Sequence, residues 1–197
     1  MLDKLLKDIN IVLASKSPRR IALLEMLNIK FLHIESTADE TINEQDHKNP
    51  RRYACRVASD KCNNISKDMF PNCLIIAADT IVYHNKQILG KPNSEDTAFA
   101  YLSSLSGDTH AVYTAICISY KAKRYSAVER TNVVFKKLSE QEIRDYIATR
   151  EPMDKAGAYG IQGYGSQFIE KINGCYFNVM GFPINKFYQL IEQILKG

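Results

Sequence analysis

The sequence lacks the long apolar runs and paired cysteines that mark membrane and disulfide-bonded proteins. No run approaches the roughly 20 residues that span a bilayer. The first ten residues carry Asp3 and Asp8 among their lysines and lack the apolar core of a signal peptide. Five cysteines without a CxxC pair argue against a disulfide framework or a zinc site and favour buried, reduced thiols. We therefore expect a cytoplasmic protein.

Strong charge bias, internal repeats and several catalytic motifs are also missing. The net charge of +4 is too small to argue for nucleic acid, and there is no helix-turn-helix or aromatic-basic stripe. Neither a Walker A loop nor a G-x-S-x-G elbow occurs, and the four histidines lack metal-ligand spacing. No low-complexity linker divides the 197 residues, so we expect a single domain over residues 1–197.

Apolar periodicity and turn residues predict alternating strands and helices with hairpins between them. The polar segment 36–49 is predicted to be a loop. The predicted strands are 9–14, 31–35, 73–78, 81–83, 87–89, 110–120, 125–135, 167–172 and 175–179. The predicted helices are 18–28, 50–64, 94–105, 139–149 and 183–195. This order predicts an α/β protein with a mixed, twisted sheet flanked by helices.

The segment 13–20, Leu-Ala-Ser-Lys-Ser-Pro-Arg-Arg, predicts a phosphate site. Ser17 suits an N-cap and Pro18 the first helical position, so the first-turn N–H groups point at a ligand above the strand end. The cations beside them are Lys16, Arg19 and Arg20. The hydroxyls of Ser15 and Ser17 are interpreted as phosphate ligands.

Asp79 follows the apolar run 73–78, and the end of a buried strand is where open α/β sheets place ligands. It is the best candidate for a catalytic acid or base, with Thr80 orienting a ligand or water. A turn-capping role for Asp79 is equally open. In Gly90-Lys91-Pro92 the proline fixes the backbone, so Lys91 either meets a phosphate oxygen or is a solvated turn lysine.

The segment 151–163 carries three glycines in seven residues, which allows close backbone approach. It presents Asp154, Lys155 and Gln162, and the amide of Gln162 can read a nucleobase edge. A purely structural turn is the alternative. Taken alone, Glu40 and Lys61 are read as surface charges.

Together these stretches resemble the Maf family of nucleoside triphosphate pyrophosphatases. The matching pieces are 13–20, Ala78-Asp79-Thr80, Gly90-Lys91-Pro92, 151–163 and Asn178-Val179-Met180-Gly181-Phe182-Pro183, in family order. The resemblance implies hydrolysis of a nucleoside triphosphate between the α and β phosphates. It also implies a divalent cation (Mg²⁺ or Mn²⁺), a homodimer, and a sheet bent between two lobes, as in inosine triphosphate pyrophosphatases, with the site in the central cleft.

The resemblance also implies a role for each residue. Asp79 is the general base and Glu40 a metal or water ligand, so both are candidate metal ligands. The triphosphate grip is formed by Ser15, Arg19, Arg20, Lys61 and Lys91, and base preference is set by Arg19, Thr80 and Gln162. The Lys-Ala-Gly-Ala-Tyr-Gly-Ile-Gln form of 155–162 resembles the dTTP/UTP branch.

Two alternatives remain beside this interpretation. One keeps the enzyme and changes the base to a purine or to 7-methyl-GTP. The other is a non-enzymatic regulator of cell division that acts through a protein or DNA partner.

Overall fold

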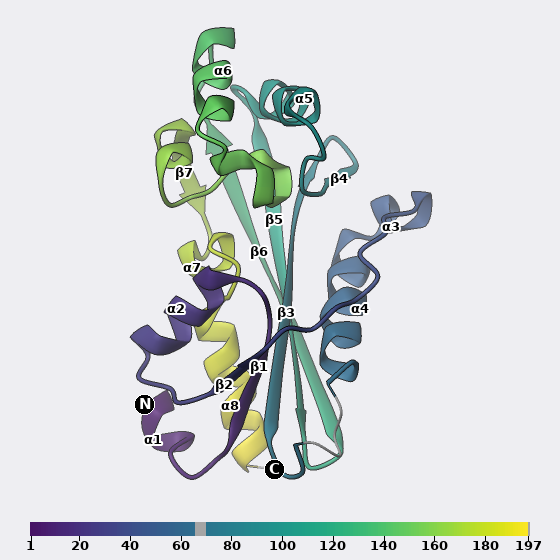
Figure 1. The fold of residues 1–197 in the computed structure, drawn as a ribbon, viewed down its shortest axis with the longest axis vertical. Coiled ribbons are helices and arrows are strands. Elements are labelled where there is room, and N and C mark those ends of the chain that lie inside the picture. The colour runs from purple at the N-terminus through teal and green to yellow at the C-terminus, as the bar shows by residue number, and fades with distance from the viewer. Residues whose placement is uncertain (66–69, 197) are drawn as a thin grey trace.

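A computed structural model describes residues 1–65 and 70–196 of the chain. One mixed sheet is flanked by helices (Figure 1). Its strands are β1 Ile11–Ala14, β2 Leu32–Ile34, β3 Leu74–His84, β4 Gln87–Leu89, β5 Thr109–Tyr120, β6 Lys123–Phe135 and β7 Ile169–Asn173. The helices are α1 Leu2–Leu5, α2 Pro18–Met26, α3 Glu44–Lys48, α4 Pro50–Asn63, α5 Glu95–Leu105, α6 Glu140–Ala148, α7 Tyr176–Val179 and α8 Ile184–Lys196. This confirms the predicted α/β class.

Within the described residues the sheet has seven strands, in the order β2-β1-β3-β5-β6-β7, and β4 also pairs with β3. The β1 strand is parallel to both β2 and β3, whereas the remaining pairs are antiparallel. Figure 1 shows β3, β5 and β6 running along the length of the molecule, with α5 and α6 at one end and α1, α2, α4 and α8 around the other.

The β3 strand is continuous through Asp79, so the prediction that a strand ends at residue 78 is wrong. Asp79 pairs with Ala115 of β5, and the ladder runs on to Tyr83. Because side chains alternate along a strand, Asp79 and Thr80 point to opposite faces of the sheet. Asp79 faces α4, and Thr80 faces α2.

One edge of β3 is open beside Asp79. The β1 strand pairs with β3 only as far as Ala77, and β4 joins the same edge only from Val82. Among the strands that the structure describes, residues 78–81 therefore pair with β5 alone. Asp79 is not at the end of its own strand, but it lies level with the carboxyl end of the neighbouring parallel strand, where ligands bind in open sheets.

Three apolar clusters hold the elements together. One packs α2 and α8 on one face of the sheet, around Leu13, Leu24 and Phe187. A second packs α4 on the opposite face through Ala54 and Val57. The third joins α5, α6 and the 3₁₀ turns at the other end of the molecule; the turns are Glu151–Asp154, Ala156–Ala158 and Tyr164–Phe168.

The capping residues in the sequence fix several boundaries as predicted. The hydroxyl of Ser94 accepts the N–H of Thr97 at the start of α5. Ser139 and Glu142 form the expected capping box of α6. Asn85 and Lys86 both have positive φ in the β3–β4 turn, which suits a two-residue hairpin.

Two local predictions are wrong. The segment 36–49 is not wholly loop, because Asn43 and Asp46 form a capping box that starts α3. Residues 175–179 are not the second strand of a hairpin: β7 pairs with β6, and the chain after Gly174 turns into α7. The Asn178 side chain explains the turn, since its Nδ2 donates to Val112 O at 3.0 Å and to Thr131 Oγ1 at 2.9 Å.

All five cysteines are free, and Cys62 and Cys117 are buried. In the part of the chain that the structure describes, no helix has the combined length and apolarity needed to cross a membrane.

Candidate active site

A cavity of about 730 Å³ lies at the open edge of β3. Its walls come from the β1–α2 junction, the segment after β2, the centre of β3, the turn after β4 and the 3₁₀ segment. The ten residues to which the sequence gives a site role all line it: Ser15, Ser17, Arg19, Arg20, Glu40, Lys61, Asp79, Thr80, Lys91 and Gln162. Residues far apart in the chain thus meet in one cavity, while their individual roles stay predictions.

Two carboxylates share one ammonium group at the floor of the cavity. Lys61 Nζ donates to Asp79 Oδ1 at 2.8 Å and lies 2.7 Å from Glu40 Oε1. The side chains of Lys61 and Asp79 are only 10% and 9% exposed, whereas that of Glu40 is 44% exposed. The buried pair is therefore weakly screened by water, and Glu40 forms the solvent-facing side.

The environment shifts the pKa values of the two carboxylates, Asp79 and Glu40, in opposite directions. Burial raises the pKa of Asp79, although Lys61 and Arg20 oppose the shift. For Glu40, burial also raises the pKa, but the hydrogen bond and charge of Lys61, with Lys91 and Arg20, bring it below its usual value. Two neighbouring carboxylates whose pKa values are pushed apart in this way are typical of acid–base sites.

Two residues that the sequence did not single out support this group. Tyr53 donates its hydroxyl to the backbone oxygen of Glu40 at 2.7 Å. Ser36 donates to the backbone oxygen of Lys61 at 2.5 Å. Each ties the loop after β2 to α4. No sequence signal finds either contact, because both join segments that are brought together only by the fold.

Arg20 is buried, and its guanidinium donates hydrogen bonds to other protein groups. Its Nε donates to Gly181 O at 2.8 Å, Nη1 to Ser15 Oγ at 3.1 Å and Nη2 to Thr80 Oγ1 at 3.0 Å. Thr80 Oγ1 also lies 3.0 Å from Thr114 Oγ1. The guanidinium therefore joins three segments of the cavity wall, and its positive charge adds to the field inside.

The start of α2 lies on the same wall. Ser17 is the N-cap residue as predicted, but its side chain makes no capping bond. Two N–H groups at this helix end bond within the segment: the N-cap Ser17 N donates to Ser15 Oγ, and Arg20 N in the first turn donates to Ser17 O. The Ser17 hydroxyl and the half-buried Arg19 side chain line the cavity near this helix end.

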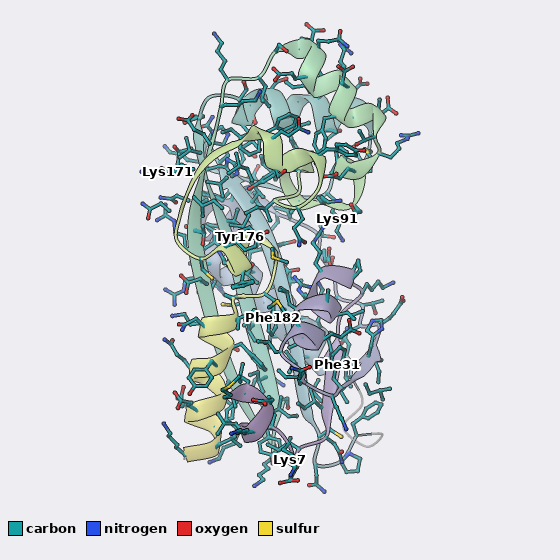
Figure 2. The ribbon with its side chains drawn as sticks, turned by 90° about the vertical axis from the view of Figure 1, so that its left-hand side faces the viewer. Lys7, Phe31, Lys91, Lys171, Tyr176 and Phe182 are labelled. Atoms are coloured by element: carbon teal, nitrogen blue, oxygen red, sulfur yellow. The ribbon has the colours of Figure 1, made fainter. Side chains whose placement is uncertain are left out.

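Lys91 and the 3₁₀ segment close the opposite side. Lys91 is 62% exposed, and its Nζ is 3.9 Å from Glu40 Oε2. Figure 2 shows Lys91 at mid-height, between the green upper helices and the purple α2 helix below it. Gln162 is exposed, and Lys155 is held by Glu151 O and Asp154 Oδ1 at 2.7 and 2.6 Å.

The charges of the cavity suit a polyanion. Six basic and three acidic side chains line it: Lys16, Arg19, Arg20, Lys61, Lys91 and Lys155 against Glu40, Asp79 and Asp154. Among residues 1–65 and 70–196, no three His, Cys, Asp or Glu side chains gather as a metal cluster. Of the three acidic side chains, Asp79 and Glu40 share Lys61, and Asp154 pairs with Lys155.

Comparisons with known proteins identify curated relatives and solved structures that are similar to this chain. A dTTP/UTP pyrophosphatase of Clostridium perfringens (strain SM101) is 46% identical over 92% of this chain and 95% of its own length. A dTTP/UTP pyrophosphatase of Syntrophomonas wolfei is 49% identical over 92% of this chain and 95% of its own length. Among solved structures, the Staphylococcus aureus Ham1 protein matches with a TM-score of 0.48 and 13% identity, over 95% of this chain and 98% of that one.

The family resemblance seen in the sequence is confirmed over nearly the whole chain. The model of the Maf-like protein family matches residues 10–194, which include every residue of the cavity described above. The chain therefore belongs to the Maf family.

Proposed function

We propose that this protein hydrolyses nucleoside triphosphates to a nucleoside monophosphate and pyrophosphate, with dTTP and UTP preferred. Family membership and the names of its relatives support the reaction and the pyrimidine preference. Those names do not favour a purine substrate or a purely regulatory role in cell division. The reaction removes nucleotides from the triphosphate pool, which is a house-cleaning activity.

The observation that carries the proposal is the buried Asp79 carboxylate beside Lys61, inside a cavity lined mainly by cations. A carboxylate with a raised pKa is a stronger base than an exposed one. Asp79 accepts the proton of the attacking water. Lys61 holds the carboxylate in place through its 2.8 Å contact. In the reaction, Lys61 also offsets the charge that develops on the phosphate oxygens.

The remaining cations bind the triphosphate, whose charge is about −4. Arg19 and Lys91 line different walls of the cavity and can turn toward phosphate oxygens, although Lys91 also lies 3.9 Å from Glu40 Oε2. The hydroxyls of Ser15 and Ser17 donate to phosphate at the start of α2. Arg20 acts through position, because its three contacts fix Ser15 and Thr80.

A divalent cation of the Mg²⁺ or Mn²⁺ type fits the donor set. Such ions take one or two carboxylates together with substrate phosphate oxygens. Asp79 and Glu40 would hold the ion, and the depressed pKa of Glu40, which Lys61 and Lys91 lower against the effect of burial, keeps that ligand ionised. When bound, the cation supplies charge neutralisation at the phosphates.

Base preference is assigned to Arg19, Thr80 and Gln162. The Gln162 amide offers both a donor and an acceptor, which match a carbonyl and the N–H of uracil or thymine. The Thr80 hydroxyl is engaged with Arg20 and Thr114, so it shapes the pocket by its position. The proposal also includes a homodimer, which the family resemblance implies. Composition supports a cytoplasmic protein without a nucleic-acid partner. Light scattering tests the dimer.

The decisive experiment measures pyrophosphate release from dTTP, UTP, dCTP, GTP and 7-methyl-GTP with Mg²⁺ or Mn²⁺. Asp79→Asn should lower turnover by roughly a hundredfold or more while the fold is kept. Asp60→Asn is the matched control, since Asp60 is a partly exposed carboxylate on α4 that pairs with Arg56. Wild-type turnover in Asp79→Asn would refute the assignment of the base. No release from any nucleotide with either metal would favour the regulatory alternative.

Gln162→Glu tests the base preference in the same assay. The substitution replaces the amide donor by an acceptor, so the preference for dTTP and UTP over the other nucleotides should fall. An unchanged order of preference would remove Gln162 from the proposal.

A further inference from the structure

The Glu151 carboxylate lies inside the turn formed by residues 160–165. Its Oε1 accepts from the Tyr146 hydroxyl at 2.9 Å and from the Gly165 N–H at 3.1 Å. Its Oε2 accepts from the Tyr164 N–H at 2.9 Å. Among the ion pairs of the described residues, none includes this carboxylate. Glu151 therefore organises backbone rather than balancing a nearby cation.

The same contacts hold both ends of the segment that presents Gln162. The Tyr146 hydroxyl, which donates to Glu151, also accepts the Gly160 N–H at 3.2 Å. Gly160 precedes Gln162, and residues 164–165 follow it. A peptide that is tied on both sides to one Glu151–Tyr146 pair has little freedom between the ties.

The turn is packed so closely on this pair that it cannot shift independently. A Cβ atom at Gly163 would lie 2.5 Å from Glu151 Oε2, and φ there is +80°. A Cβ at Gly165 would lie 2.6 Å from Gly160 O and 2.7 Å from Tyr146 Oη. Any movement of the carboxylate therefore moves the turn with it.

Gly160, Ile161 and Gln162 all line the cavity, whereas Glu151 does not. We propose that Glu151 is a positioning residue for base selection, which acts by fixing the 160–165 turn so that Gln162 meets the pyrimidine edge in one orientation. This inference rests on the proposed function. On that edge uracil and thymine present the N3–H donor and the O4 acceptor, whereas cytosine presents an N3 acceptor and an amino donor. Because an amide that can turn over matches either pattern, only an amide with a fixed direction can tell them apart.

The test replaces Glu151 by glutamine and compares dTTP with dCTP. In Glu151→Gln an amide NH₂ takes the place of one oxygen and faces an N–H donor, so part of the turn is released. KM for dTTP should rise roughly tenfold with kcat nearly unchanged, and the preference for dTTP over dCTP should fall by a similar factor. Glu140→Gln is the matched control, because Glu140 is an exposed residue of α6 that pairs with Arg144.

A double variant separates positioning from a general structural role. If Glu151 acts through Gln162, then Glu151→Gln adds no further loss to Gln162→Ala. Additive losses, or an equal fall of kcat for every nucleotide, would overturn the inference.

Tyr146→Phe keeps the ring and removes only the hydroxyl, so it provides a second variant if Glu151→Gln folds poorly. It should change the same KM and selectivity, and amide exchange at residues 164–165 should accelerate in both variants. An active wild type whose variants keep the dTTP preference overturns this inference alone. A wild type that hydrolyses no nucleotide overturns the proposed function and the inference together.

Discussion

Removal of the Lys61 ammonium should leave Asp79 as a buried carboxylate without its closest partner. Lys61→Met keeps most of the side-chain length and deletes the 2.8 Å contact with Asp79 Oδ1. Because both side chains are at most about one tenth exposed, we expect a loss of about 3–5 kcal/mol in the free energy of unfolding. For a chain of this size the loss lowers Tm by about 6–20 °C.

The pH dependence of that loss provides an internal check. In the variant, the pKa of Asp79 rises further, because burial already raises it and Lys61 no longer opposes the shift. A carboxyl whose folded pKa exceeds its unfolded value makes stability fall as pH rises. The destabilisation by Lys61→Met should therefore be larger at pH 8 than at pH 5.5. Urea unfolding in the presence of EDTA measures it without a bound cation.

A second substitution decides whether the unpaired charge is the cause. Adding Asp79→Asn to Lys61→Met removes that charge and should recover much of the lost stability. Lys48→Met, at an exposed residue of α3, is the control for removal of a lysine charge. A loss below about 1 kcal/mol that is equal at both pH values and is not relieved by Asp79→Asn would refute the reasoning.

Three further predictions concern stability and are checked by urea unfolding, and the last of them is also checked by the dTTP assay. Burial lowers the pKa of His110 to about 3, so at pH 5 this imidazole is protonated in the unfolded chain but not in the folded one. The free energy of unfolding should therefore fall by about 2 kcal/mol between pH 7.5 and pH 5, and the fall should be smaller in His110→Gln. Asn178→Ala removes the side-chain N–H that donates to Val112 O and should lower the free energy of unfolding by about 2–3 kcal/mol. An unchanged stability would contradict the role of the Asn178 side chain in holding α7. Arg20→Lys keeps the charge but cannot place three donors in one plane, so we expect a loss of about 2 kcal/mol and a lower kcat; full activity would exclude Arg20 as a positioning residue.

Local chemistry made much of the fold predictable from the sequence. The capping residues Ser94 and Ser139 locate the starts of α5 and α6, and the apolar runs locate the long strands. The strand through Asp79 was missed because two polar residues in an apolar run read as a strand end. Only the fold brings Lys61 beside Asp79, and the lysine charge compensates the buried carboxylate, which allows Asp79 to lie inside a strand.

The remaining errors also have physical causes. The capping box at Asn43 and Asp46 was present in the sequence but was hidden in a strongly polar segment. Asn173-Gly174 has the composition of a hairpin turn, yet the side-chain bonds of Asn178 hold the following residues as a helical turn. The residues predicted for the site share one cavity, whereas Glu151, which supports the turn around Gln162, was overlooked because its contacts are to backbone N–H groups.

The long strands have a consequence for how this architecture can diversify. Both β3 and β5 contribute side chains to all three apolar clusters, so the same two strands form part of the core at both ends of the molecule. A crossover at the level of the cavity would cut both strands and leave neither half with a complete core. A substitution at the exposed Gln162 leaves both strands intact, so we expect new base preferences to arise more readily there than from exchange of whole halves between relatives.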